Sequence, residues 1–214
     1  MTRIYLIRHG ETQSNLENRI QGWLDTQLTE AGFQQAEALG QRFQNIPVDA
    51  VYASDLQRAM DTAQVICNIH NLPLHTDPAL REMNLGEWSG QTTAELSRTQ
   101  GEQMALFRAV DPQWHAPGGE TYLQLRDRVD GALQQIVANH PGQTVAVVSH
   151  GGGIKQVLAK YKGLSVSESK DDIKQGNTSV NLIEFDGEEI RVTLQGDTSH
   201  LAYLDRKANT YNGY

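Results

Sequence analysis

Two histidines lie in similar local surroundings far apart in the chain, and either could act as a nucleophile. His9 follows the apolar run 4–7 and is preceded by Arg8, whereas His150 follows the apolar run 145–148; a glycine comes after each. Short apolar runs of this kind are typical of buried strands, and α/β folds place their chemistry at the carboxyl ends of strands. Two imidazoles and an arginine at such ends predict a nucleophile in a site built for an anion. We expect that anion to be phosphate.

The elements that must position these residues alternate between strand and helix. Periodicity and capping signals predict the strands 4–7, 48–53, 74–76 and 144–149, and helices from Thr29 to before Pro47, from about Leu56, over 93–109, from Thr121 and over 154–161. The segments 181–185 and 190–194 are predicted to form a β-hairpin with its turn at Asp186-Gly187. Residues 195–214 show no periodic pattern from which an element could be predicted. The alternation of strands with helices implies a parallel sheet with right-handed crossovers. We therefore expect an α/β fold of three layers, α/β/α, with a mostly parallel central sheet and a C-terminal hairpin.

Two further charged residues, Arg58 and Glu82, follow the second and third predicted strands. Because the carboxyl ends of parallel strands lie along one edge, both could converge with the histidines on one crevice. Arg58 falls in the first turn of a helix whose N-cap would be Ser54 or Asp55, where a cation opposes the helix dipole by about 0.3–1 kcal/mol. It could point to solvent or pair with Asp55. An anion bound by both the arginine and the helix N–H groups better explains an arginine in this first turn.

Composition limits the classes of partner. The formal net charge is −8 and the pI is about 5.3, so the overall field repels nucleic acid and anionic membranes, and a phosphate site must be a local cationic pocket. The N-terminal apolar run is too short for a signal segment or a membrane span. Cys67 is the single cysteine, which excludes an internal disulfide and favours a reducing, cytoplasmic location. Without a composition break or repeat, we expect one domain over 1–214.

The sequence resembles the histidine phosphatase superfamily, in the branch related to cofactor-dependent phosphoglycerate mutase. The resemblance runs through nearly the whole chain in blocks that keep their order: 6–12 with Asn15, 19–22, 28–32, 52–59 with Thr62 and Ala63, 80–82 with 85–90, 117–120 and 148–152. An isolated Arg-His-Gly would be weak support. The ordered set implies a phosphoglycerate mutase-like fold.

The resemblance also implies a role for each matching residue. His9 would be the nucleophile that becomes phosphohistidine, and Glu82 would be the general acid. Arg8, Arg58 and His150 would surround the transferring phosphoryl group. Further hydrogen bonds to the phosphate would come from Asn15, Gln21 and the backbone N–H groups of Gly22 and Gly151.

Elementary chemistry is consistent with these roles. A neutral imidazole is a competent nucleophile near pH 7, and nearby cations should lower the pKa of His9. The arginines can balance the phosphoryl charge, and no Asp/His cluster has metal-ligand spacing, so we expect neither a metal nor another cofactor. Glu82 must carry a proton to act as an acid, which partial burial near Leu80, Met83 and Leu85 would favour. Glu87 is a weaker candidate for that acid.

Hydrolysis of a small phosphate monoester is the expected reaction, with phosphoglycerate mutase as the alternative. The mutases of the family carry a longer insertion with a lysine and paired arginines, whereas between Trp88 and Gln124 this chain has only Arg98 and Arg108. A lid-like helical insertion at about 89–120 offers instead five apolar lid candidates: Met104, Leu106, Phe107, Val110 and Trp114. A silent phosphate-ester-binding protein is a third possibility.

Several other residues are expected to have ordinary structural roles. Cys67 should be a small buried residue, and the run 170–172 a solvated face. Among the remaining histidines His115 has the best prospect of a function, since it precedes the Pro117-Gly118-Gly119 loop. We expect a monomer or a homodimer.

Overall fold

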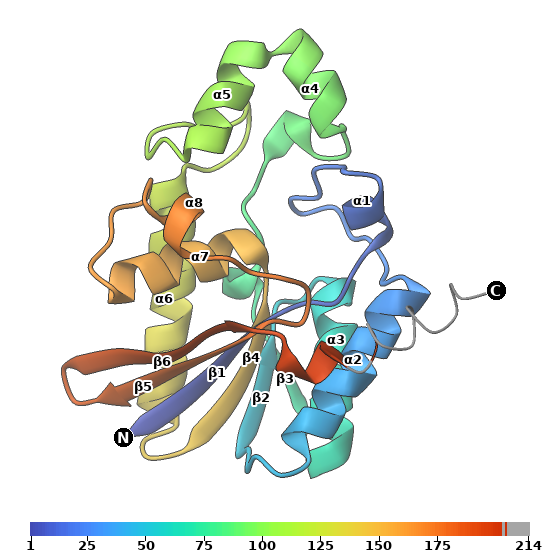
Figure 1. The fold of residues 1–214 in the computed structure, drawn as a ribbon. Helices are drawn as coiled ribbons and strands as arrows, with labels where there is room; N and C mark the ends of the chain where they lie inside the picture. The colour runs from blue at the N-terminus through green and yellow to red at the C-terminus, as the bar shows by residue number, and fades with distance from the viewer. Residues whose placement is uncertain (203, 205–214) are drawn as a thin grey trace.

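The computed structural model describes residues 1–202 and 204, and its centre is a six-stranded sheet (Figure 1). The strands are β1 (Thr2–Arg8), β2 (Ala50–Ala53), β3 (Leu74–Thr76), β4 (Thr144–Ser149), β5 (Val180–Asp186) and β6 (Glu189–Asp197). Their order is β3-β2-β4-β1-β5-β6, with the first four mutually parallel and the β5–β6 hairpin antiparallel at one edge. The predicted mostly parallel sheet with a C-terminal hairpin is confirmed.

Helices cover both faces of this sheet. The helices are α1 (Gln13–Leu16), α2 (Glu30–Phe43), α3 (Gln57–His70), α4 (Thr93–Thr99), α5 (Gly101–Ala109), α6 (Tyr122–Asn139), α7 (Gly151–Tyr161) and α8 (Ser169–Asp172), with 3-10 turns η1 (Pro78–Leu80), η2 (Gly86–Trp88) and η3 (Ser199–Leu201). Apolar residues of α2 and α3 pack on one face, whereas those of α6 and α7 pack on the other. The three-layer prediction is therefore confirmed.

Most element boundaries follow local capping signals, but the start of α3 does not. Thr29 caps α2, and Thr121 with Gln124 forms the predicted capping box of α6. The N-cap of α3 is Leu56, not Ser54 or Asp55. Its first free N–H groups are satisfied by Ser54 Oγ, which accepts from Leu56 N at 3.3 Å, and by Asp25 Oδ1, which accepts from Gln57 N at 2.8 Å.

Other boundaries move by a few residues. The strand β2 begins at Ala50, not at 48, and α7 begins at Gly151, three residues before the predicted Ile154. That earlier start matters because it makes His150 the N-cap of α7 and places the glycines in its first turn. Residues 195–197 complete β6 and 199–201 form η3; positions 203 and 205–214 of the C-terminal segment lie outside the described part.

The segment 89–120 forms α4 and α5, which lie beyond the end of the sheet (Figure 1). It is anchored by an aromatic cluster in which the Trp88 and Trp114 ring centroids are 4.8 Å apart, and Trp114 and Met104 are 4% and 1% exposed. Because these two side chains are packed in the core, they are not free lid residues. The lid role of the segment and the single domain stay predictions. None of the described helices is long and apolar enough to cross a membrane.

Candidate active site

The two histidines meet because their strands are neighbours. The parallel register pairs Arg8 with Ser149, so His9 and His150 leave β1 and β4 side by side. Their ring centroids are 5.1 Å apart, and both side chains are buried, at 3% and 0% exposure. The juxtaposition expected from two apolar runs is thus present.

The hydrogen bonding of His9 fixes which nitrogen can react. His9 Nδ1 lies 2.7 Å from the carbonyl oxygen of Gly10, which can only accept, so Nδ1 carries the proton and Nε2 keeps its lone pair. Burial, followed by the charges of Arg58 and Arg8, holds the pKa of His9 well below its usual value. The sequence predicted that the pKa of His9 would be lowered, but it attributed this to the nearby cations alone. Burial is the larger cause.

His150 is the second neutral imidazole. Burial, followed by the charge of Arg58, also holds the pKa of His150 well below its usual value. Both of its ring nitrogens are buried without a hydrogen-bond partner among the described residues. A buried polar group in that state is expected to have a partner when the site is filled.

Two buried arginines supply the positive charge. Arg58 is 0% exposed and is held by the carbonyls of Leu24 and Gly22, to which Nη1 and Nη2 donate at 2.7 and 2.9 Å. Arg8 Nη1 donates to the carbonyl of Gln175 at 2.7 Å. The Nε atom of each arginine is buried and, within the described residues, has no acceptor. Burial lowers the pKa of Arg58 to about 10, so it remains charged at neutral pH.

Glu82 joins the site through the first turn of α7. Its Oε2 accepts from Gly152 N at 3.1 Å, and its Oε1 accepts from Met83 N at 2.8 Å. Its carbonyl is held by Trp23 Nε1 at 2.7 Å and by Arg128 Nη2 at 3.1 Å. These bonds fix the carboxyl group beside the cationic centre.

The predicted phosphate donors Asn15 and Gln21 are oriented by their own oxygens. Asn15 Oδ1 accepts from Thr12 N at 3.1 Å, and Gln21 Oε1 accepts from the hydroxyls of Thr12 and Thr26 at 3.0 and 2.6 Å. With both amide oxygens occupied, the NH₂ groups are the ends available to a phosphate.

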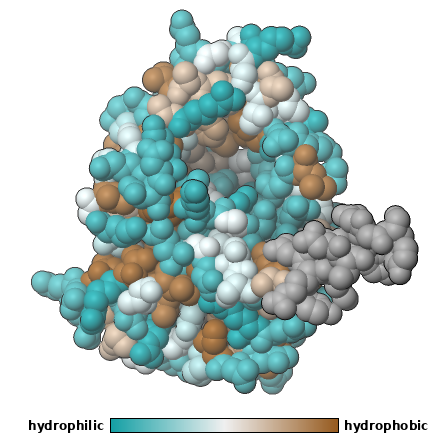
Figure 2. All heavy atoms as spheres, viewed as in Figure 1, coloured by the Kyte–Doolittle hydropathy of each residue, from teal (hydrophilic) through white to brown (hydrophobic). Residues whose placement is uncertain are grey.

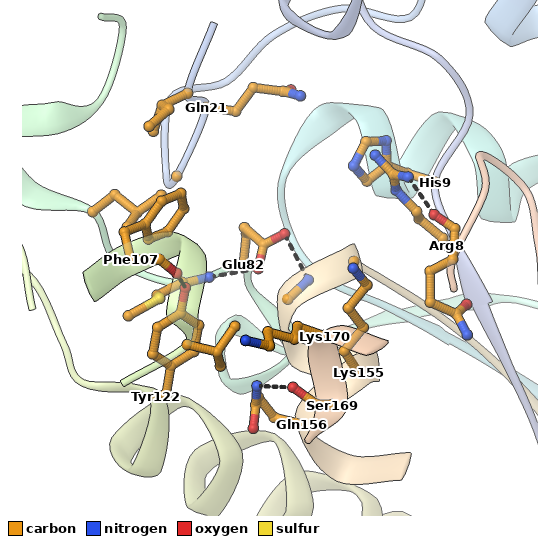
Figure 3. A pocket seen from close by; sticks show the side chains of 18 of the residues that line it. Arg8, His9, Gln21, Glu82, Phe107, Tyr122, Lys155, Gln156, Ser169 and Lys170 are labelled. Carbon is orange, nitrogen blue, oxygen red and sulfur yellow. Dashed lines mark hydrogen bonds between the residues drawn. The ribbon is translucent and has the colours of Figure 1, made fainter. Parts of the chain in front are cut away.

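These residues surround a cavity of about 330 Å³ (Figure 3). All the predicted site residues line it except His150, which is fully buried beside His9. The molecule is hollowed on the face drawn in Figure 2, between the α4–α5 segment and the strand ends. Of the five lid candidates only Phe107 and Val110 line the cavity, and the exposed Leu106 lies with His115 at a separate hollow.

Sequence reasoning missed several lining residues, of which Lys155 and Lys170 matter most. Lys155 could have been found, because it lies four positions after Gly151 and so on the same face of α7. Lys170 was placed on a solvated face; it is exposed, but it also lines the cavity. No local pattern marks it, since tertiary packing alone brings α8 to this place.

A second layer behind His9 was also missed. The carbonyl of His9 accepts from Thr178 N at 3.3 Å and from Asn177 Nδ2 at 3.2 Å. Thr178 adopts a left-handed backbone conformation, with φ of 52°, that β-branched residues rarely take. The segment 175–179 therefore supports both Arg8 and His9 from behind.

The ionisable side chains of the site do not form a metal centre. Within residues 1–202 and 204, no group of three or more His, Cys, Asp or Glu side chains could hold a metal ion. Positive charge in the cavity is instead supplied by arginine and lysine side chains.

Comparison with known proteins gives consistent matches along the chain. The chain is 40% identical over 202 residues to phosphoglycerate mutase-like protein 4 of Arabidopsis thaliana, covering 92% of this chain and 86% of that protein. It is 35% identical over 217 residues to a metal-independent phosphoserine phosphatase of the same plant, covering 100% and 89%. A mutant phosphoserine phosphatase from Entamoeba histolytica, solved with phosphoserine, superposes with a TM-score of 0.84 at 29% identity, covering 94% and 100%.

The family model of the histidine phosphatase superfamily (branch 1) matches residues 4–198. This match and the relatives confirm the predicted family, its phosphoglycerate mutase-like fold and the enzyme class of a phosphatase. The chain belongs to branch 1 of the histidine phosphatase superfamily.

Proposed function

We propose that the protein hydrolyses small phosphomonoesters in two steps, through a phosphohistidine on His9 and without a metal. The observation that carries this proposal is the state of His9: a buried imidazole with Nε2 uncommitted, beside Arg8 and Arg58, whose Nε donors have no partner among the described residues. A phosphoryl group placed against that nitrogen would meet the donors that spread its charge.

In the first step His9 Nε2 attacks phosphorus. The N–P bond forms as the ester P–O bond breaks, and Glu82 donates a proton to the departing alkoxide oxygen. Both Glu82 oxygens accept backbone N–H groups, which hold the carboxyl group in a fixed orientation for this proton transfer. Arg8 and Arg58 balance the charge on the equatorial oxygens, and the neutral His150 ring donates a hydrogen bond to them.

In the second step water replaces the alcohol. Glu82, now ionised, accepts a proton from the water molecule. The water oxygen attacks phosphorus at the same time, and the N–P bond breaks. His9 returns to its neutral form and inorganic phosphate leaves. The hollow on the face shown in Figure 2 gives water a route to this intermediate.

The proposed substrate is a small phosphorylated metabolite, since a cavity of about 330 Å³ holds little more than one. Phosphoserine is the first candidate, because two similar proteins are phosphoserine phosphatases. A cytoplasmic location and a monomeric or homodimeric state stay predictions from the sequence.

Phosphoglycerate mutase activity is the second candidate function. The similar proteins include a phosphoglycerate mutase-like protein and probable phosphoglycerate mutases, and Lys155 and Lys170 give the cavity cations that residues 89–120 do not contribute. The sequence argument against a mutase was therefore incomplete. Access of water to the cavity keeps hydrolysis the better proposal.

A panel of phosphomonoesters tests the proposal. Phosphate release by EDTA-treated protein would be measured beside isomerisation of 3-phosphoglycerate. We expect at least one ester to be hydrolysed with kcat/KM above about 10⁴ M⁻¹s⁻¹. Isomerisation without phosphate release would support the mutase, dependence on added metal would contradict the mechanism, and inactivity on every ester would support a binding protein.

A further inference from the structure

The cavity holds more positive charge than a phosphoryl group needs. Within the described part of the chain, its charged lining residues are four cations, Arg8, Arg58, Lys155 and Lys170, and one carboxylate, Glu82. With neutral histidines this is an excess of three positive charges inside a protein whose net charge is −8. A bound phosphoryl dianion leaves one positive charge without a counterion when Glu82 is ionised, and two when Glu82 carries the proton that it donates in the first step.

The two lysines are the cations without another role. Arg8 and Arg58 are fixed by carbonyl groups, whereas among the described residues neither lysine makes a hydrogen bond or an ion pair. Two lysines on or just after α7 do have partners: Lys160 binds Asp130 at 2.6 Å and Lys162 binds Gln195 at 2.9 Å.

The two lysines enter the cavity from different helices and in different directions. Lys155 extends from α7 toward the space between Glu82 and Arg8, and Lys170 extends from α8 on the side of Tyr122 (Figure 3). Lys155 is half-buried, and burial together with the charge of Arg8 lowers its pKa. The opposite charge of Glu82 offsets these two effects only in part, so an anionic ligand would further stabilise the ammonium group of Lys155.

We propose that Lys155 and Lys170 bind a carboxylate on the substrate, so that the preferred substrate is a small phosphorylated carboxylic acid. This inference rests on the proposed phosphomonoesterase function and assigns to two residues the recognition of the carboxylate that a substrate such as phosphoserine carries. The negative charge of a carboxylate does not exceed the remaining positive charge in either state of Glu82, whereas a second phosphate, with about two negative charges at neutral pH, exceeds it when Glu82 is ionised. Because both lysines come from segments after His150, this specificity is set outside the 89–120 insertion.

A matched pair of substrates tests the inference. 3-Phosphoglycerate and glycerol 3-phosphate differ at one carbon, which is a carboxylate in the first and a hydroxymethyl group in the second. We expect kcat/KM to favour 3-phosphoglycerate by about 10- to 100-fold, the range of a charge-assisted hydrogen bond. In Lys155→Gln, Lys170→Gln and the double variant, that ratio should fall toward one, mainly through KM for 3-phosphoglycerate. Lys162→Gln, an exposed lysine outside the cavity, should keep it.

Each other outcome has a definite meaning. Equal rates for the two substrates in the wild type, or a ratio unchanged in the double variant, would overturn the inference. Equal losses on both substrates would reassign the lysines to the phosphoryl group. Preference for a bisphosphate such as fructose 1,6-bisphosphate would replace the carboxylate by a second phosphate.

A binding measurement separates this inference from the proposed function. If neither substrate nor 4-nitrophenyl phosphate is hydrolysed, the proposed function fails. Calorimetric titration of both ligands into the wild type and the double variant then decides the lysine assignment alone. Tighter binding of 3-phosphoglycerate that disappears in the variant would support it, and equal affinities would overturn it.

Discussion

The imidazole rings of His9 and His150 lie 5.1 Å apart, centroid to centroid, at the ends of two adjacent parallel strands. Both rings are buried beside Arg8 and Arg58, and the pKa of each is held well below its usual value. The pair is therefore neutral at physiological pH. One ring is free to attack phosphorus while the other can donate to the phosphoryl oxygens.

Buried neutral histidines make the stability of the fold depend on pH. An unfolded histidine takes up a proton near pH 6.5, whereas partial burial, followed by the charge of Arg42, lowers the pKa of His200 to about 4. Between these values the unfolded state binds more protons, so the free energy of unfolding should decrease as the pH falls from about 6.5 to about 4. Urea denaturation across this range measures the effect. His200→Gln should reduce the pH dependence, and an unchanged dependence would contradict this account of His200.

Glu82→Gln should slow hydrolysis most for esters with poor leaving groups. The amide keeps the shape of the carboxyl group but cannot give a proton, so alkyl phosphates should lose about 10²- to 10⁴-fold in kcat. Hydrolysis of 4-nitrophenyl phosphate should lose far less in the first step, because its leaving group needs little protonation. Rapid-quench measurement of alcohol release on both esters isolates that step. Equal losses on the two would remove Glu82 from the general-acid role.

Gly152→Ala should displace Glu82 without altering its chemistry. A methyl group at this position would overlap Glu82 Oε1, with Cδ at 3.2 Å, so the carboxyl group must move away from its backbone donor. We expect kcat for alkyl phosphates to fall, as it should in Glu82→Gln. Gly131→Ala is the matched control, since Gly131 lies on α6 with no atom within 4 Å of an added methyl group. Wild-type kcat in Gly152→Ala would show that the observed Glu82 position is not needed.

Asn177→Asp should weaken the support of His9. Its Nδ2 donates to the carbonyl of His9 at 3.2 Å and to Asn15 Oδ1 at 3.3 Å, and a carboxylate would place an acceptor against both oxygens. We expect kcat to fall by about 10-fold for misplacement of the nucleophile. Asn139→Asp, an exposed change on α6, serves as the control. A change confined to thermal stability, with kcat unaffected, would limit Asn177 to a structural role.

The sequence predicted those parts of the site that local signals encode. His9 and His150 each lie two positions after an apolar run, and Thr121 with Gln124 is a capping box visible in four residues. The predicted N-cap of α3 was wrong because Asp25, which accepts the hydrogen bond of Gln57 N, comes from a segment far away in the chain. Lys170 was missed for a similar reason, since only the packing of α8 beside α7 brings it to the cavity.

Trapping the intermediate tests the central claim most directly. Protein mixed with a hydrolysed substrate, quenched in alkali within the first turnover and digested, would be analysed by mass spectrometry for an acid-labile phosphoryl group. We predict that the group is on His9, that it turns over with the rate of phosphate release, and that His9→Ala lacks both the adduct and the activity. Phosphoryl transfer to another residue, or phosphate release by the His9→Ala variant at a rate near that of the wild type, would contradict the account.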